Sequence, residues 1–352
     1  MREVAIVSFA QLPAVRRDHV REDTEMLLPV LHEAVAASGI AKKDLGFTVS
    51  GSTDYLCGRP FSFVMALDAV GAFPPISESH VEMDGAWALY EAWVRLQHGD
   101  VDSALVYAFG KSSLGDVRAV LTQQLDPYLV APLGPDSVSL AALQARVLLD
   151  RGRTTEREMA EIAARSRRDA MRNPSAQLRF DRGADLLLAE PYLVEPLRRH
   201  DCPPISDGAC AMVIAAGDLA RRVSRRPVFI AGIDHRIEAQ GLGLRDLGDS
   251  PSTRLAAERA GVARAKVDFA EIHAPFTHQE VLVRDALGLA PGTPINPSGG
   301  ALASNPVMVA GLTRIGEAAA RIQAGDGERA VAHATSGPCL QQNLVCVLEA
   351  RS

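Results

Sequence analysis

Three side chains in this sequence have types and positions that suit acid–base chemistry. Glu82 and Asp84 lie directly before an apolar helical pattern that begins at Gly85, and His273 follows a short apolar run. Acids at a helix start are commonly solvated residues that complement the helix dipole. If they face a buried pocket, desolvation would raise their pKa and allow a carboxylate to act as a base. An imidazole at a strand end can stabilise an oxyanion, although a lone histidine in an apolar stretch is more often structural.

The segment that carries the two acids occurs twice in the chain. Five of its residues recur 226 positions later (311 − 85 = 226): Gly85, Gln97, Gly99, Asp100 and Ala104 match Gly311, Gln323, Gly325, Asp326 and Ala330. Each copy predicts an amphipathic helix, a Gly-Asp turn and a short strand. Residues 4–7 (VAIV) and 228–231 (VFIA) predict the buried strands that open two related halves. We therefore expect an α/β fold with mostly parallel sheets that are buried on both faces.

Composition excludes several classes of protein. The chain has 352 residues, of which 47% are hydrophobic and 23% charged, so it can bury a large core in one to three domains. It lacks a signal-like start and an apolar stretch of roughly 18 residues, so we expect a cytoplasmic protein without a membrane span. A net charge of −6 argues against nucleic acid as a partner. Five cysteines without paired or zinc-like spacing predict reduced thiols and no metal site.

A stretch of different character, residues 112–203, separates the first repeat from the second half. Thr155 and Glu158 have the spacing of a capping box, which predicts the start of a helix. Between residues 165 and 182 there are six arginines and two acids. This charge either forms a solvated helix face or binds a phosphorylated ligand, because the arginine fork matches phosphate oxygens. Arg167 and Arg168 are our candidates for such contacts.

Three motifs together resemble the thiolase superfamily, and within it the sterol-carrier-protein-x or lipid-transfer-protein type. Residues 171–177 (MRNPSAQ) are similar to the family's NPxAQ element, residues 204–209 (PISDGA) to its SDGAAA strand, and residues 295–300 (INPSGG) to its NxxGG turn. Each motif is weak alone, but their order and spacing are specific. The resemblance covers nearly the whole chain.

The resemblance implies a thiolase fold, in which a duplicated five-layered αβαβα core carries an inserted loop domain. We expect an N-terminal half at residues 1–111 plus 204–225, a loop domain at 112–203 and a C-terminal half at 226–352. In the family, coenzyme A lies against the loop domain and its pantetheine reaches a pocket between the halves. Coenzyme A is therefore expected as part of an acyl-CoA substrate, with these candidate contacts: Arg167, Arg168, Ser206, Gly299 and Gly300.

The resemblance also shows where this chain departs from an ordinary thiolase. The family's acyl-accepting cysteine lies at the tip of the first repeat helix, where a thiolate is activated by the helix N-terminus. Here that position falls on Glu82 or on Gly85, depending on the alignment register, and no cysteine occurs between Cys57 and Cys202. We therefore do not expect a ping-pong thiolase.

Three further family positions bear on the chemistry. His273 matches the first residue of the HDCF loop, whose imidazole can stabilise an enolate. Asn305 replaces the histidine of the GHP turn, and its amide can donate a hydrogen bond but cannot act as a base. Ala334 falls on the second catalytic cysteine; Cys339 could substitute for it after a loop shift, or could simply be a small buried thiol.

Our leading hypothesis is retro-aldol cleavage of a bulky, sterol-like β-hydroxyacyl-CoA, since this reaction needs a base and an oxyanion hole but no nucleophile. Aldolases of the group use tyrosines, and none occurs at His273 or along residues 333–343, so the base would be Glu82, Asp84, His273 or a group of another chain. Expected partners are a second copy, a thiolase-like paralogue or a small OB-fold acyl-CoA-binding protein. The alternatives are a non-catalytic acyl-CoA- or lipid-binding subunit that supports an active paralogue, and a cysteine-independent acyltransferase.

Overall fold

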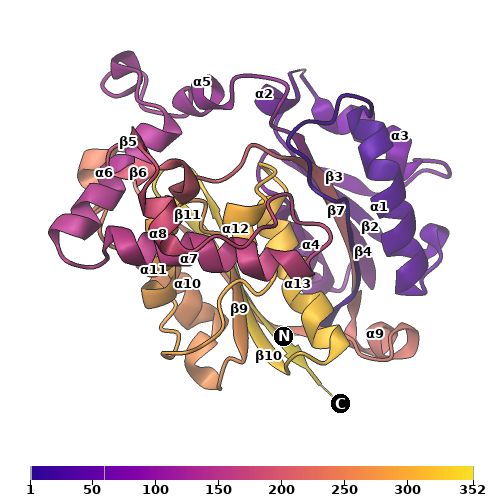
Figure 1. The fold of residues 1–352 in the computed structure, drawn as a ribbon. Coiled ribbons are helices and arrows are strands. Elements are labelled where there is room, and N and C mark those ends of the chain that lie inside the picture. Colours follow the sequence, from indigo (N-terminus) through magenta and orange to yellow (C-terminus); the bar gives the residue numbers. More distant parts are fainter. Residues whose placement is uncertain (1, 59, 352) are drawn as a thin grey trace.

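The computed structural model describes residues 2–58 and 60–351 as an α/β fold around a large sheet. Within these residues nine strands follow the order β3-β2-β4-β7-β1-β8-β11-β10-β9 (Figure 1). The first half contributes β1 (Val4–Gln11), β2 (Phe47–Gly51), β3 (Glu78–Val81), β4 (Ser103–Lys111) and β7 (Asp207–Ala216). The second half contributes β8 (Val228–Ile237), β9 (Phe269–Ile272), β10 (Arg329–Ser336) and β11 (Gln342–Ala350). The predicted opening strands β1 and β8 are confirmed, and they pair where the halves meet.

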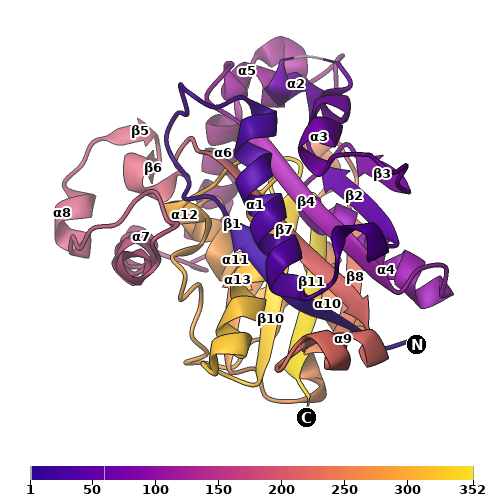
Figure 2. The same ribbon diagram turned by 90° about the vertical axis from the view of Figure 1, so that its right-hand side faces the viewer.

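Helices cover both outer faces of the sheet and fill the space between its halves. The outer face of the first half carries α1 (Asp23–Ser38), α3 (Ser62–Val70) and α9 (Gly217–Val223), and Figure 2 shows α1 in front of these strands. The central layer is α4 (Gly85–His98) and α13 (Ala310–Ala324). The outer face of the second half carries α10 (Pro251–Ala260) and α11 (Thr277–Ala286). This αβαβα order confirms the predicted layered fold.

The repeated unit is also confirmed in detail. α4 and α13 each end at a glycine in the left-handed region, Gly99 at φ 82° and Gly325 at φ 92°. Glycine adopts this conformation without a Cβ clash, so it closes the helix and turns the chain toward the next strand. Those strands are β4 and β10, at the predicted positions. The two copies therefore share caps as well as sequence.

The predicted direction of the strands was wrong. Parallel pairs occur between β2 and β3, β2 and β4, and β9 and β10. In contrast, β7, β1, β8 and β11 form antiparallel pairs along the middle of the sheet. The strands are apolar throughout because helices cover both faces, and this pattern does not depend on strand direction.

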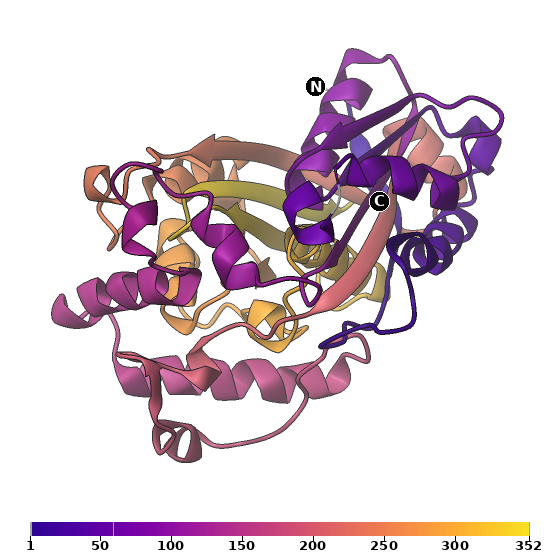
Figure 3. The same ribbon diagram turned by 90° about the horizontal axis from the view of Figure 1, so that it is seen from above.

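The segment between β4 and β7 lies over one end of the two halves. It contains α5 (Val117–Thr122), α6 (Ser137–Asp150), α7 (Glu156–Asp169), α8 (Ala184–Leu188), β5 (Tyr192–Val194) and β6 (Leu197–Arg198). Seen from above, α7 runs along one edge of the molecule (Figure 3). The predicted cap is confirmed, since Thr155 Oγ1 accepts from Glu158 N at 3.1 Å. The Glu158 carboxylate instead accepts from Thr154, so the reciprocal half of the box is not formed.

Two short helices complete the fold, α2 (Asp54–Cys57) and α12 (Gly300–Ala303). All five cysteines are buried, and none is in a disulfide among the residues that the structure describes. Among residues 2–58 and 60–351, no helix combines the length and the apolar character that a bilayer crossing requires.

Candidate active site

A cavity of about 960 Å³ is lined by both halves and by the insert between β4 and β7. Four of the predicted site residues line it: Asp84, Arg167, His273 and Asn305. The other five do not: Glu82, Arg168, Ser206, Gly299 and Gly300. The fold therefore places three of the four predicted catalytic residues in one cavity. Most of the predicted coenzyme A contacts lie outside it.

His273 follows β9 and forms a pair with Asn305. The His273 Nε2 atom lies 3.0 Å from Asn305 Oδ1, and the backbone N–H of Thr335 points at Nδ1 from 3.4 Å. Because that N–H can only donate, Nδ1 is the acceptor and Nε2 carries the proton. Burial lowers the pKa of His273 to about 4, so the ring is neutral at pH 7. The Asn305 oxygen is thereby occupied, and its NH2 group is the donor left for a ligand.

The backbone of Asn305 is held by Ser206. Asn305 N donates to Ser206 Oγ at 3.1 Å, and Ser206 forms a parallel bridge with Pro306. Ser206 is fully buried and does not reach the cavity. We predicted Ser206 as a coenzyme A contact; in the structure its hydroxyl instead holds the backbone of Asn305.

Asp84 links the N-termini of the two central helices. Its Oδ1 accepts from Ala86 N at 2.9 Å and from Leu312 N at 3.0 Å, and its Oδ2 accepts from Gly311 N at 2.9 Å. Burial raises the pKa of this carboxyl, whereas the three N–H groups and the Arg314 charge oppose the rise. A Cβ at Gly311 would lie 2.5 Å from Asp84 Oδ1, so this contact requires glycine.

Glu82 faces away from the cavity, contrary to its predicted role as a candidate base. Its side chain is 49% exposed, and its carboxylate accepts from Asp54 N at 2.8 Å. Asp54 is the first residue of α2, and a helix N-terminus attracts a carboxylate. His80 Nε2 lies 3.3 Å from the other oxygen. Of the two acids before α4, only Asp84 lines the cavity.

Of the two arginines predicted to contact coenzyme A, Arg167 lines the cavity and Arg168 does not. The buried Arg167 guanidinium donates to Ala163 O at 3.1 Å and to His200 O at 2.9 Å, so it is largely committed to the protein. Burial lowers the pKa of Arg167 to about 10. Arg168 is exposed and lies outside the cavity, which corresponds to the solvated-face alternative.

Three exposed arginines line the cavity and are here called the arginine mouth: Arg16, Arg182 and Arg199. Arg182 belongs to the arginine-rich stretch of residues 165–182, for which the sequence left phosphate binding open, whereas Arg16 and Arg199 were missed. Arg182 lies over the Phe180 ring at 5.3 Å from its centroid. An aromatic residue two positions before an arginine was the available signal for this site. Nothing in the local sequence connects Arg16 or Arg199 with it.

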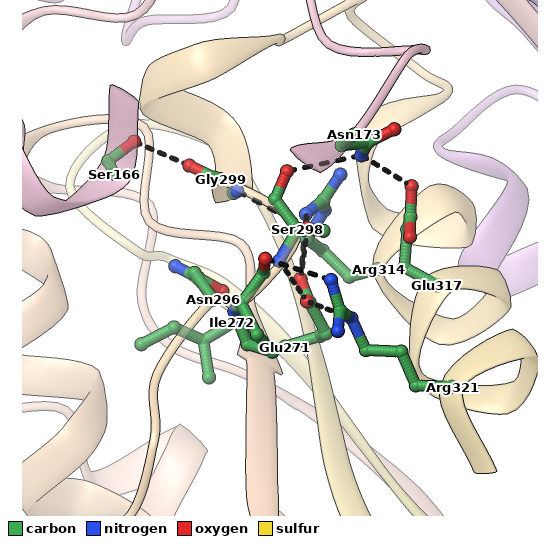
Figure 4. Close-up of polar contacts among 12 residues, drawn as sticks. Ser166, Asn173, Glu271, Ile272, Asn296, Ser298, Gly299, Arg314, Glu317 and Arg321 are labelled. Carbon is green, nitrogen blue, oxygen red and sulfur yellow. Dashed lines mark hydrogen bonds and ion pairs between the residues drawn. The ribbon is translucent and has the colours of Figure 1, made fainter. Parts of the chain in front are cut away.

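A buried polar network holds β9 in place directly before His273 (Figure 4). Glu271 accepts from Ser298 N at 2.9 Å, from Ser298 Oγ at 2.6 Å and from Arg314 at 2.8 Å. The next residue, Ile272, donates its N–H to Asn296 Oδ1 at 2.6 Å. Hydrogen bonds thus fix the end of β9 at Glu271 and at Ile272, and this fixes the position of His273, the next residue in the chain.

The turn that contains Gly299 and Gly300 packs against the insert and does not contact the cavity. A Cβ on Gly299 would lie 2.6 Å from Ala170 Cβ, and φ at Gly299 is +100°. Ser166 of α7 donates to Gly299 O, and Asn173 donates to Ser298 O at 3.1 Å (Figure 4). These glycines therefore permit close packing, and they lie outside the cavity where we predicted that they contact coenzyme A.

Cys202 and Cys339 line the cavity as protonated thiols. Burial raises the pKa of Cys202 to about 12 and that of Cys339 to about 11. The Cys339 thiol donates to Leu140 O at 3.4 Å. A thiol is a poor nucleophile compared with a thiolate. Within the part of the chain that the structure describes, no three His, Cys, Asp or Glu side chains are grouped to hold a metal ion.

Comparisons with known proteins agree with this architecture. No family model matches the chain. Acetyl-CoA acetyltransferase of Methanothermobacter thermautotrophicus is 26% identical over 96% of this chain and 95% of its own. Human sterol carrier protein 2 is 23% identical over 87% of this chain and 62% of its own length. A solved structure named Ltp2-ChsH2(DUF35) aldolase superposes with a TM-score of 0.82 at 19% identity, covering 99% of this chain and 98% of that one. Its sequence relatives are thiolase-superfamily proteins, and its fold matches that of thiolase-fold structures.

Proposed function

We propose that this protein cleaves a bulky, sterol-like β-hydroxyacyl-CoA by a retro-aldol reaction. The observation that carries the proposal is the pairing of a carboxylate with an oriented amide donor in one cavity that holds no thiolate. Asp84 and Asn305 line this cavity together, and both cysteines in its wall are protonated. Such a site lacks the nucleophile of acyl transfer but contains a base and an oxyanion donor.

The reaction divides between these two groups. Asp84 accepts the proton of the β-hydroxyl, and the O–H electron pair becomes the C=O bond of a ketone. The Cα–Cβ bond breaks, and its electrons pass to Cα and the thioester oxygen as an enolate. The Asn305 NH2 group donates to that oxygen, where the charge develops. Asp84 then returns the proton to Cα, which yields a shortened acyl-CoA. Protons and electrons balance without a co-reactant.

His273 acts in this scheme as a positioning residue. Its Nε2–H holds the Asn305 oxygen, so the amide presents its NH2 group in one orientation. A charged imidazolium is not needed, and the low pKa of His273 disfavours one. Preorganised donors of this kind contribute to catalysis because they need no rearrangement during the reaction.

Coenzyme A is bound in this proposal through the arginine mouth. Its phosphate groups are anionic, and exposed guanidinium groups match phosphate oxygens. The three arginines of the mouth line the same cavity as Asn305, so one ligand can contact both. We further propose a partner subunit of the OB-fold acyl-CoA-binding type or a second thiolase-like chain. The name of the structural neighbour, Ltp2-ChsH2(DUF35) aldolase, joins two components and supports this.

One observation favours a non-catalytic acyl-CoA-binding subunit as the second candidate. The Asp84 carboxylate already accepts three backbone N–H groups, and a double helix cap accounts for a buried acid without chemistry. A cysteine-independent acyltransferase has less support. Its support is limited to the name of the archaeal relative, an acetyltransferase.

Product analysis by mass spectrometry tests the proposal. The protein, with and without co-purifying partners, is mixed with β-hydroxy and β-keto sterol-type CoA thioesters. We expect a ketone and a shortened acyl-CoA from the β-hydroxy substrates, and loss of both products in Asp84→Asn. Glu82→Gln is the matched control and should keep activity, because Glu82 lies outside the cavity. Retention of intact thioester with every partner would favour the binding subunit.

A further inference from the structure

Met308 lines the cavity in a backbone conformation that its side chain disfavours. Its φ is +71°, in the left-handed region that a bulky residue rarely adopts. Glu82, the equivalent residue of the first copy (82 + 226 = 308), does not have a positive φ. Met308 is half-buried and lines the same cavity as Asp84 and Asn305. Backbone strain of this kind persists only where the surroundings enforce it, and it is common at functional sites.

Contacts with three segments hold the turn that carries Met308. Gly85 N donates to Met308 O at 2.9 Å, and Val307 N donates to Ser112 Oγ at 3.2 Å. A Cβ at Gly110 would lie 2.3 Å from Val307 O, so the turn packs directly against the backbone of β4. The turn cannot move away from a ligand without breaking these contacts, and the start of the Met308 side chain is therefore fixed beside the cavity.

Met308 lies between the two groups that the proposed reaction uses. Asn305 belongs to the same turn, residues 305–308, and Met308 O accepts the N–H of the residue that follows Asp84. In the proposed reaction Asn305 contacts the thioester oxygen and Asp84 contacts the β-hydroxyl. Cα is the atom that joins the two carbons bearing these oxygens. A substrate that reaches both groups therefore places its Cα beside Met308.

We infer that Met308 is a specificity-determining residue that excludes a branch at Cα, so that the substrate of this protein carries a CH2 group there. The inference rests on the proposed acyl-CoA function and narrows its substrate class. The unbranched thioether side chain of methionine fills irregular space beside a small group. A methyl branch on Cα competes for that space, and one methyl group in a closed pocket changes affinity by about 10-fold or more. The shortened product of retro-aldol cleavage is then acetyl-CoA.

Calorimetric binding of two isomeric probes tests the assignment without requiring turnover. Butyryl-CoA has a CH2 group at Cα, and isobutyryl-CoA has the same composition with a methyl branch at Cα. We expect the wild-type protein to bind butyryl-CoA about 10-fold more tightly than isobutyryl-CoA. Met308→Gly should reduce this preference to less than about 2-fold, and Met308→Leu should keep it, because leucine has a similar volume. Glycine adopts a positive φ without strain, so the glycine variant should fold.

Two controls separate Met308 from general effects on the protein. Met171→Gly makes the same substitution at a residue that is 57% exposed and lies outside the cavity, so it should keep the preference. Free coenzyme A has no acyl group and should bind equally to Met308→Gly and to the wild-type protein. Equal binding of the two isomers by the wild-type protein, or an unchanged preference in Met308→Gly, would overturn the assignment of Met308 alone. Selective binding of butyryl-CoA without cleavage of any β-hydroxyacyl-CoA would keep the assignment and reject the lyase function.

Discussion

The two halves repeat one helix–turn–strand unit but contribute unequally to the end of the cavity that holds the proposed catalytic residues. The second half provides His273, Asn305 and Thr335, whereas the first half provides Asp84. At the position equivalent to Asp84 (84 + 226 = 310) the second half has Ala310, and one carboxylate caps both helices. The position equivalent to Glu82 is Met308, which lines the cavity, whereas Glu82 faces away from it. The two copies share one backbone arrangement. A few side chains at the N-termini of α4 and α13 make their contributions to the cavity different.

The largest effect we expect comes from removing the shared cap. Asp84→Ala leaves three buried N–H groups without acceptors, and each unsatisfied group costs about 1 to 3 kcal/mol. We expect the free energy of unfolding to fall by about 4 kcal/mol in a denaturant titration. Glu82→Ala is the control and should change it by less than about 1 kcal/mol, because Glu82 is half exposed. Similar losses in both variants would contradict the assignment of Asp84 as a double cap.

The second-largest effect concerns the second half, which provides the proposed oxyanion donor Asn305. Asn305→Ala should lower kcat by about 100-fold with little change in KM, as expected for the loss of an oxyanion donor. If His273 acts through Asn305, then His273→Phe should add little further loss in the double variant, because coupled residues are not additive. Independent and additive losses would assign His273 a direct contact with the substrate.

Buried histidines in the second half predict a pH dependence of stability. Burial lowers the pKa of His278 to about 3, below its ordinary value of 6.5, so the unfolded chain binds more protons between these values. The stability from a neutral His278 is fully present above pH 6.5 and is lost as the pH falls below it. Between pH 7.5 and 5.5 this costs about 1.4 kcal/mol. His278→Gln should therefore lose about 1.4 kcal/mol less than the wild-type protein over the same range.

The smallest effect we expect is on acyl-CoA affinity, and it distinguishes two arginines of the insert. Arg182→Ala should weaken acyl-CoA binding by about 5-fold, because a partly solvated charge pair is worth about 1 kcal/mol. Arg168→Ala should leave the affinity unchanged, since Arg168 is exposed outside the cavity. Equal effects of the two substitutions in a titration would show that coenzyme A lies along the face of α7 and not in the mouth.

Local features were predictable from the sequence, and features set by packing were not. The repeated helices, their glycine caps and the Thr155 cap depend on residues close in the chain, and all are confirmed. Strand direction was mispredicted because apolar runs occur in either direction when both faces are covered. Glu82 and Asp84 are two residues apart, yet only the contact between α4 and α13 decides which one is buried. The arginine mouth combines residues far apart in the chain, and only the fold brings them together.

The hydrogen bonds between the insert and the turn at residues 295–300 have a kinetic consequence. Ser166 and Asn173 tie the insert to Gly299 and Ser298, and Asn173 also donates to Glu317 at 2.8 Å. Swinging the insert open would break several buried bonds at once, each worth about 1 kcal/mol. We therefore expect ligands to pass lengthwise through the arginine mouth. In the proposed reaction the ketone would leave by that route only after the shortened acyl-CoA has left the mouth, and slower release should accompany larger ring systems.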